Sequence, residues 1–465
     1  MAKYVLLSLV IFLLTSCGSE TKKQPPLLKI SENNRYLQTE NGDPFFWLGD
    51  TGWLLFSKLT REEAEQYLEN RRQKGFNVIQ VMVLHSVKNA VNVYGDTALI
   101  DSKIDKPLTT TGNSFDDPAQ YDFWDHIDYI VDLAGEKGLY MALVPIWGSN
   151  IRAGVADRVQ AKTYASWLAE RYHERNNVIW LNGGDIRGDD STAVWNTIGN
   201  TIRQTNSNQL ITFHPFGRTL SSQWFHNETW LDFNMFQSGH RRYDQDTAGL
   251  AYGEDNWKYA KADYSLMPVK PTLDGEPSYE GIPQGLHDTT QPYWTDADVR
   301  RYAYWSVFAG GCGFTYGNNA IMQFYKPTDK NPAYGAREYW DVAINAPGAS
   351  QMQYLKQLML SRPYFGRVPA NDLLASPQGE KYDYIAVTRG DDYVYAYTCN
   401  GGNITFKMKD LPMSEYKVSW FDPRNGTTTN TGFNIGVAKN SSETTFDPPG
   451  EKQPGNDWVL ILEKI

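Results

Sequence analysis

The fold is decided by the stretch Asn177-Val178-Ile179-Trp180-Leu181-Asn182-Gly183-Gly184-Asp185. Its apolar run, residues 178–181, is too short for a helix and rich in strand-forming side chains, which predicts a buried strand. Gly183 and Gly184 allow the backbone to turn without a steric penalty, so that Asp185 follows just past the C-terminal end of the strand. In a parallel barrel, this rim is where catalytic side chains collect.

Short apolar runs alternate with amphipathic segments along most of the chain, as is typical of repeated βα units. Thr60, with Glu63 three residues later, forms a capping-box pattern that predicts a helix running to about Lys74 and ending at Gly75. Eight strands in this arrangement predict a (β/α)8 barrel over about residues 30–365, an α/β fold. The predicted strands cover residues 45–48, 77–84, 139–145, 178–181, 210–215, 233–236, 271–277 and 313–317.

The remaining residues, 366–465, show a different pattern that contains no helical periodicity. Short strand-like runs are separated by turns rich in Gly, Asn and Pro, which predicts a small antiparallel β-sandwich after the barrel. These runs cover residues 382–387, 393–397, 403–408, 416–421 and 458–462.

The N-terminus has the pattern of a targeting segment. Lys3 precedes an apolar core at residues 6–14, and Cys17 follows a small residue, which resembles a bacterial lipoprotein signal covering residues 1–17. The resemblance implies cleavage before Cys17 and lipidation of its thiol, with residues 18–29 as a tether. The apolar core is too short to span a bilayer, so we expect an envelope lipoprotein, periplasmic or on the outer-membrane surface, held only by its lipid. The alternative is an ordinary secretory signal with a chance cysteine.

The composition of the 465-residue chain limits the classes of partner that it is expected to bind. A net charge of −10 without a long basic run argues against nucleic acid and against an anionic membrane surface. The 14% aromatic content suits a surface that stacks on sugar rings, although large barrels bury many aromatic residues in any case. Cys312 and Cys399 fall in different predicted domains, so we expect no disulfide between them. The histidines lack a metal-ligand spacing and no nucleotide-binding motif stands in a suitable context, so neither a metal nor a cofactor is predicted.

Two acids form the strongest candidate for chemistry. Asp185 and Glu276 follow the fourth and seventh predicted strands, whose ends point across one pocket in a closed barrel. Glycoside hydrolysis needs two carboxyl groups flanking the scissile bond, so this pair predicts a glycosidase. The alternatives are a helix cap or a pair with Arg187 for Asp185, and an ion pair with an arginine for Glu276. Glu280 competes for the same role, whereas Asp274 is expected to face the barrel interior or a structural partner.

Other polar and aromatic side chains stand at or just past predicted strand ends. Trp and Tyr rings can stack on sugar faces, and His, Gln, Asn and acidic groups can bind hydroxyls. A lone histidine is more often structural, so a structural role stands beside each of these assignments. The candidate substrate-binding residues are Asp50, Trp53, His85, Trp147, Asn182, Arg187, His214, Gln237, His240, Tyr279 and Tyr316.

Arginines gather at the same rim in a chain that is acidic overall: Arg187, Arg218, Arg241 and Arg242. A guanidinium matches a uronate carboxylate in bidentate geometry, which favours an acidic sugar in the substrate. The alternative is that these arginines neutralise the acids of the rim. A polar insertion at residues 86–120 either forms a wall of the binding site or is a disordered surface loop.

Three segments together resemble glycoside hydrolase family 140, the apiosidases: FWLGDTGW at residues 46–53, WLNGGD at 180–185 and DGEPSYE at 274–280. The late segment VSWFDPRNG, residues 418–426, resembles a collagen-binding-type β-domain found in such proteins. We expect that β-domain to pack on the barrel in a structural role.

The resemblance implies a retaining glycosidase that cleaves an apiosyl linkage in side chains of the pectin rhamnogalacturonan II, within a glycan-degrading system of Bacteroidota. It also implies Asp185 as the acid/base and Glu276 as the nucleophile. An apiosyl–galacturonic acid target would suit the arginines. Two alternatives remain open: a barrel glycosidase acting on another plant glycan, and a non-catalytic surface lipoprotein that binds glycans. Many enzymes of this barrel clan place Glu where Asp185 stands, and the two preceding glycines would let the backbone approach closer to compensate.

Overall fold

A computed structural model describes residues 24–246, 252–375, 379–436 and 443–465. The predicted signal segment, with its lipidation site at Cys17, lies outside these ranges. None of the helices within the described ranges is long and apolar enough to cross a membrane.

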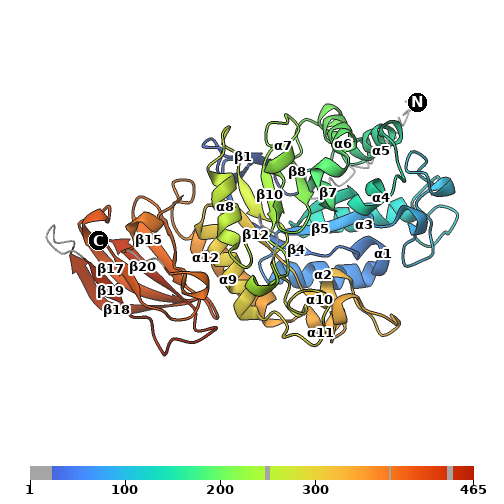
Figure 1. The fold of residues 1–465 in the computed structure, drawn as a ribbon. Helices are drawn as coiled ribbons and strands as arrows, with labels where there is room; N and C mark the ends of the chain where they lie inside the picture. The colour runs from blue at the N-terminus through green and yellow to red at the C-terminus, as the bar shows by residue number, and fades with distance from the viewer. Residues whose placement is uncertain (1–23, 247–251, 376–378, 437–442) are drawn as a thin grey trace, which may run out of the picture.

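The larger part of the chain is a barrel built on a nine-stranded sheet (Figure 1). The strand order is β8-β7-β6-β5-β4-β12-β11-β10-β9, and only β9 (Thr219–Leu220) runs antiparallel to its neighbour. The amide of Asp232 donates to the carbonyl of Ile211, which joins the segment before β10 to β8 across the closing edge. The eight parallel strands are β4 (Trp47–Thr51), β5 (Val78–Leu84), β6 (Tyr140–Ile146), β7 (Val178–Ile186), β8 (Ile211–Pro215), β10 (Asn234–Gln237), β11 (Thr272–Asp274) and β12 (Gly313–Tyr316).

Helices surround this sheet, and the helix predicted from Thr60 to about Lys74 is present as α2 (Arg61–Gln73). The capping box is confirmed: the Thr60 side chain accepts the Glu63 amide, and the Glu63 carboxylate accepts the Thr60 amide. The long helices are α2 (Arg61–Gln73), α3 (Phe123–Glu136), α5 (Arg158–Arg171), α6 (Thr192–Thr205), α8 (Asn256–Tyr264), α9 (Asp296–Phe308) and α12 (Pro347–Leu360). The short helices are α1 (Leu55–Lys58), α4 (Gly148–Arg152), α7 (Ser222–Phe225), α10 (Asn319–Met322) and α11 (Trp340–Ala343).

The first barrel strand begins later than predicted. Phe45 belongs to β3 (Pro44–Phe45), which pairs with β2 (Leu37–Thr39) and through it with β1 (Leu28–Ile30) in a separate three-stranded antiparallel sheet. The barrel strand β4 therefore starts at Trp47 and carries the rim residues 49–51 inside the strand.

The C-terminal part is an antiparallel β-domain. Apolar side chains of its large sheet, including Val394 and Leu460, pack against Ile404, Phe406 and Phe446 of a small two-stranded sheet. The predicted barrel followed by a β-sandwich is thus confirmed. The large sheet runs in the order β13 (Val368–Pro369), β14 (Ala386–Arg389), β15 (Tyr393–Thr398), β20 (Trp458–Lys464), β17 (Glu415–Asp422) and β18 (Thr427–Gly436), and the small one pairs β16 (Ile404–Phe406) with β19 (Thr444–Phe446).

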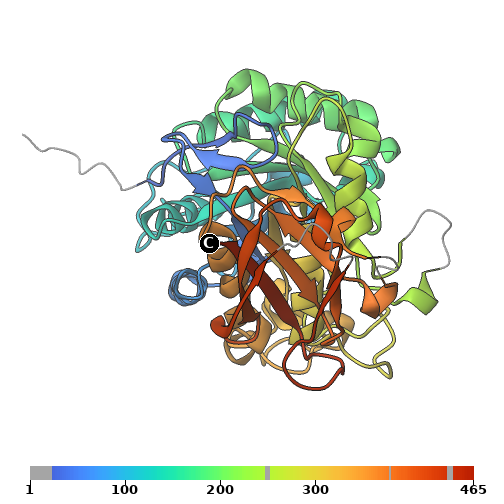
Figure 2. The same cartoon turned by 90° about the vertical axis from the view of Figure 1, so that its left-hand side faces the viewer.

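The β-domain sits against α9 and α12 on one side of the barrel (Figures 1 and 2). Strand alternation sends the tyrosines of β15 to the face opposite its apolar core, and Tyr397 stacks on Tyr304 of α9 at 4.6 Å. Arg300 of α9 binds Asp457 through two hydrogen bonds of 2.8 Å, with both side chains buried. Such a sealed, bidentate contact fixes the two parts of the molecule together, which favours a structural role for the β-domain.

Candidate active site

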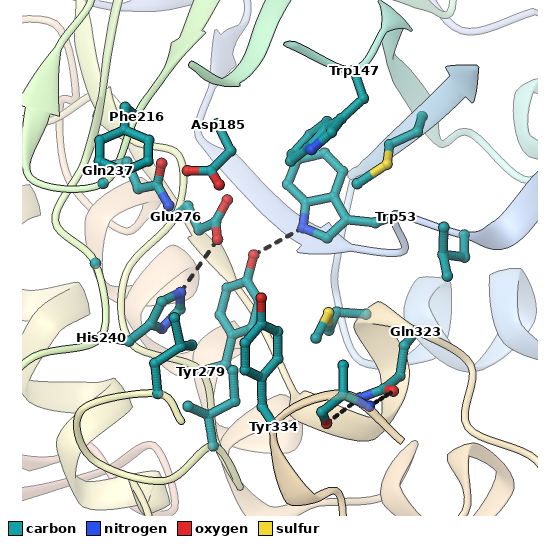
Figure 3. A pocket seen from close by; sticks show the side chains of 18 of the residues that line it. Trp53, Trp147, Asp185, Phe216, Gln237, His240, Glu276, Tyr279, Gln323 and Tyr334 are labelled. Atoms are coloured by element: carbon teal, nitrogen blue, oxygen red, sulfur yellow. Dashed lines mark hydrogen bonds and ion pairs between the residues drawn. The ribbon is translucent and has the colours of Figure 1, made fainter. Parts of the chain in front are cut away.

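A cavity of ≈ 340 Å³ opens at the C-terminal ends of the barrel strands. Asp185 comes from β7 and Glu276 follows β11, and their carboxyl groups project toward each other in Figure 3. The predicted pair is therefore brought into one cavity. The other lining residues are Trp53, Leu54, Met82, His85, Trp147, Phe216, Gly217, Arg218, Gln237, Gly239, His240, Arg241, Tyr279, Ile282, Leu286, Met322, Gln323, Ala333 and Tyr334.

The backbone of β7 bends sharply where it delivers Asp185. The strand does not end at Leu181 as predicted but continues to Ile186, with a shift of register against β8 that marks a bulge. Gly183 and Gly184 have φ angles of +93° and +101°, and Asp185 itself has +47°. A Cβ on Gly184 would lie 2.5 Å from the Trp147 ring, so glycine is required there by conformation and by space.

Glu276 is buried between two histidines. Its Oε1 accepts a hydrogen bond from His240 Nε2 at 3.3 Å, and its Oε2 lies 3.2 Å from His214 Nε2. Burial alone would raise the pKa of Glu276, but the contacts with both imidazoles outweigh it and lower the pKa to about 2. This carboxyl group is therefore ionised at neutral and mildly acidic pH.

Asp185 has the opposite electrostatic environment. Burial, and next the negative charge of Glu276, raise its pKa to about 6, against smaller opposing effects that include a hydrogen bond from the Gly217 amide. In mildly acidic solution Asp185 carries a proton while Glu276 does not. A pair of carboxyl groups whose pKa values are pushed apart in this way can supply an acid and a nucleophile or base to one bond.

Six of the predicted binding residues line the cavity beside the carboxyl pair, at or after the ends of several different strands. Trp53 donates its indole N–H to the Tyr279 hydroxyl at 2.9 Å, and its ring lies 5.4 Å from that of Trp147 (Figure 3). Gln237 is buried, and its Oε1 has no hydrogen-bond partner among the described residues. The six are Trp53, His85, Trp147, Gln237, His240 and Tyr279.

The structure places three predicted binding residues outside the cavity, in the layer between strands and helices. Asp50 accepts from Arg71 and Tyr67 of α2, at 2.5 and 2.6 Å. The Asn182 amide donates to a backbone carbonyl of α6, and the Tyr316 hydroxyl donates to Glu280. Glu280 is thus held away from the cavity with Tyr316.

Two more predicted residues occupy unexpected positions. His214 is fully buried behind the carboxyl pair, where it contacts Glu276 and the backbone of Asp185 without lining the cavity. Arg187 is exposed, does not line the cavity, and forms a salt bridge of 2.9 Å with Asp189.

Only one of the four rim arginines is free to bind a ligand. Arg241 lines the cavity, is exposed and has no hydrogen-bond or salt-bridge partner among the described residues. The other three are neutralised by nearby acids: Arg187 by Asp189, Arg218 by Asp246 and Arg242 by Asp244.

Much of the cavity wall was not predicted. Phe216 directly follows β8 and could have been found by extending the rim rule past Pro215. Tyr334 and Gln323 come from the long segment after β12, which carries no periodic signal. No residue of the insertion at 86–120 lines the cavity.

The insertion instead packs on the barrel's outer helices. Its carbonyl at Ala98 accepts from the Trp124 indole of α3 at 3.0 Å, and its Tyr94 hydroxyl accepts from the Arg61 amide of α2 at 2.9 Å. Elsewhere, Cys312 and Cys399 are buried and free. Within the part of the chain that the structure describes, no group of three or more His, Cys, Asp or Glu side chains could hold a metal ion.

Comparison with known protein families gives a match for each part of the chain. Residues 31–366 match the profile of the apiosidase-like catalytic domain. Residues 368–463 match a profile described as "Putative collagen-binding domain of a collagenase". The search of curated proteins gave no match.

Two solved structures resemble the whole molecule. One, described as a glycoside hydrolase, shares 45% sequence identity, covers 94% of this chain and 97% of its own, and superposes with a TM-score of 0.87. The other, a glycoside hydrolase family 5 protein from Bacteroides vulgatus, shares 41% identity over 94% of this chain and 93% of its own, with a TM-score of 0.88. The chain is therefore a glycoside hydrolase and belongs to the apiosidase-like family.

Proposed function

We propose that this enzyme is a retaining glycosidase that cleaves an apiosyl linkage in the rhamnogalacturonan II side chains of pectin. The observation that carries the proposal is the pair of carboxyl groups in one cavity, with the pKa of Glu276 lowered and that of Asp185 raised. The match to the apiosidase-like family supports the choice of sugar.

In the proposed first step, the Glu276 carboxylate attacks the anomeric carbon while Asp185 gives its proton to the departing glycosidic oxygen. The C–O bond to the leaving group breaks, and a covalent glycosyl-enzyme forms. In the second step, Asp185, now ionised, takes a proton from a water molecule that attacks the same carbon. The bond to Glu276 breaks, and the sugar is released with its original anomeric configuration.

The cavity suits a small terminal sugar. Its ≈ 340 Å³ lies near the lower end of the roughly 300–1,000 Å³ that ligand pockets span. The rings of Trp53, Trp147 and Tyr334 line it and offer apolar faces for a sugar ring. The unpaired Oε1 of Gln237 stands ready to accept a hydrogen bond from a hydroxyl.

Arg241 supports an acidic residue on the other side of the scissile bond. It is the cavity-lining arginine without a partner among the described residues, whereas Arg218 is paired with Asp246. A free guanidinium at the cavity binds a uronate carboxylate in bidentate geometry. This arrangement fits galacturonic acid as the residue that carries the apiose.

The proposal is tested by incubating the protein with rhamnogalacturonan II oligosaccharides that contain apiosyl–galacturonate, and identifying the released sugars. Proton NMR of the earliest product reports its anomeric configuration. We expect cleavage at the apiosyl bond with retention, and none by the Glu276→Gln variant.

Arabinofuranosides and β-glucan oligosaccharides serve as competing substrates. Turnover of one of these but not of the apiosyl bond would replace the proposed substrate with another plant glycan. Initial release of the inverted anomer would reject Glu276 as a nucleophile. Binding of the oligosaccharides without turnover would support the non-catalytic alternative.

A further inference from the structure

Among the residues that the structure describes, His214 is the one side chain with a hydrogen bond or ion-pair contact to both carboxyl-bearing residues. Its Nδ1 lies 3.3 Å from the backbone nitrogen of Asp185, and its Nε2 lies 3.2 Å from Glu276 Oε2. The ring has no exposed surface and is wedged by Trp53 and Trp147, with centroid distances of 5.2 and 6.0 Å. It cannot turn without displacing both indoles.

These contacts fix where the ring proton resides. A backbone N–H can only donate, so His214 Nδ1 must be an unprotonated acceptor. A neutral imidazole with a bare Nδ1 carries its proton on Nε2, which is the atom that faces Glu276. The ring therefore accepts a hydrogen bond from the Asp185 backbone, and its Nε2 lies 3.2 Å from Glu276 Oε2 without the alignment of a hydrogen bond.

The contact with Asp185 falls at a strained point of the chain. Asp185 has a φ of +47°, in the left-handed region that residues with a Cβ seldom adopt. The register shift in β7 removes the regular ladder bonds to β8 at this position, and His214, itself in β8, supplies an acceptor through its side chain. The imidazole thus replaces a backbone contact that the bulge breaks.

His240 offers a matched comparison. Its Nε2 also binds Glu276, but its Nδ1 has no partner among the described residues, and its ring packs edge-on against Tyr279. His240 therefore forms a hydrogen bond with Glu276 and none with Asp185, whereas His214 contacts Glu276 and accepts a hydrogen bond from the backbone of Asp185.

We propose that His214 is a positioning residue that couples the two carboxyl groups: Nδ1 holds the Asp185 backbone in its left-handed conformation, and Nε2 packs against the carboxylate of Glu276. This inference rests on the proposed roles of the two acids. The titratable groups that face Glu276 are His214 on β8, His240 after β10, Asp185 on β7, Tyr279 after β11 and Tyr334 after β12.

The first test does not depend on activity. The full chain contains seven histidines, so a sample with ¹⁵N-labelled histidine gives a resolvable set of ring signals. At neutral pH we expect His214, assigned by its loss in a His214→Asn variant, to be neutral with its proton on Nε2. A proton on Nδ1, or a doubly protonated ring, would overturn the proposal even if the enzyme cleaves the apiosyl bond.

The second test separates the two contacts. Asparagine places its oxygen near the position of Nδ1, so His214→Asn can keep the hydrogen bond from Asp185 while losing the contact with Glu276. Glutamine reaches the position of Nε2, so His214→Gln can keep the contact with Glu276 while losing the hydrogen bond from Asp185. Both variants are measured against His240→Gln, with melting temperature recorded to establish folding.

The expected readout is the pH profile of kcat/KM. Activity requires ionised Glu276 and protonated Asp185, so it rises with pH through the Glu276 pKa of about 2 and falls through the Asp185 pKa of about 6. In His214→Asn the Glu276 carboxylate loses an imidazole contact that lowers its pKa, and its limb moves up by about one to two pH units. His214→Gln keeps that limb, but kcat falls because Asp185 is misplaced.

Equal losses in all three variants with unchanged pH limbs would reduce His214 to a packing residue and overturn the proposal. If one His214 variant does not fold, the other assigns the ring signal by its loss, and the ring-proton measurement on the wild type still decides. If the wild type cleaves no glycan, the proposed function fails, and the ring-proton result stands by itself.

Discussion

Two buried carboxylates at the barrel rim, Asp50 and Glu276, differ in what neutralises them. Asp50 is fully buried and bound to the permanent cation Arg71 and to the Tyr67 hydroxyl. Glu276 is bound to two imidazoles and faces an open cavity. An arginine neutralises the charge of an acid permanently. A neutral imidazole orients a carboxylate and leaves it able to attack the anomeric carbon. The group that a rim acid contacts, rather than its position at the rim, therefore indicates whether the acid has a structural or a catalytic role.

The largest expected effect is the loss of activity in Glu276→Gln. The amide keeps the size of the side chain but cannot attack the anomeric carbon, so we expect kcat to fall by about 10⁴-fold or more. The melting temperature should stay close to that of the wild type, because no cation is left unpaired. Initial rates on an apiosyl oligosaccharide measure the loss, and a variant with near-normal rates would remove Glu276 from the mechanism.

Asp50→Asn should show the reverse pattern. Removing the charge leaves Arg71 buried without its anion, and breaking such a pair lowers the free energy of unfolding by about 3–5 kcal/mol. The folded fraction should keep its KM, because Asp50 does not line the cavity. Denaturant unfolding measures the change in stability. Wild-type stability together with a raised KM would return Asp50 to the binding site.

The contrast between Asp50 and Glu276 explains which parts of the site could be predicted from the sequence. The presence and order of the barrel strands were predictable from apolar runs and glycines, and with them the two catalytic candidates, although the strand ends were not. Side-chain direction was not, because neighbouring residues in a strand point to opposite faces. Asp50, Asn182 and Tyr316 stand at the rim but point toward the helix layer, where α2, α6 and the Glu280 loop satisfy them.

Some residues of the cavity wall and the bulge in β7 could not be predicted from the sequence. Tyr334 reaches the cavity from a segment whose path depends on tertiary packing. The bulge in β7 arises because glycines at 183 and 184 tolerate positive φ, but sequence alone cannot distinguish a bulge from a terminal turn. His214 was predicted at the rim, although its position behind both acids follows only from that bulge.

Gly184→Ala tests whether activity depends on the strained backbone conformation that places Asp185 at the cavity. An added Cβ would meet the Trp147 ring at 2.5 Å and must displace Asp185 or the indole. A misplacement of about 1 Å at a catalytic group lowers kcat about 100-fold. Gly138→Ala is the matched control: its φ is also positive, at +75°, but a Cβ there meets nothing within 4 Å. Equal activity in both variants would contradict the strain argument.

The smallest expected effect concerns Arg241. This arginine has no acidic partner among the described residues, whereas Arg71 is buried in a pair with Asp50. Losing one charge-assisted contact at an exposed site should raise KM for an apiosyl–galacturonate substrate about tenfold in Arg241→Gln. Arg187→Gln, which removes an exposed arginine already paired with Asp189, should change KM less than about twofold.

The substrate supplies the decisive control for Arg241. Methyl esterification of the galacturonate removes the carboxylate charge and keeps the glycosidic bond, so the wild type should lose its advantage over Arg241→Gln on the ester. Added salt should narrow the difference on the free acid, because screening acts on an exposed pair. If Arg241→Gln weakens binding of the acid and the ester equally, the Arg241 side chain contacts hydroxyl groups of the sugar. That result would contradict the proposal that the substrate carries a galacturonate carboxylate beside the scissile bond.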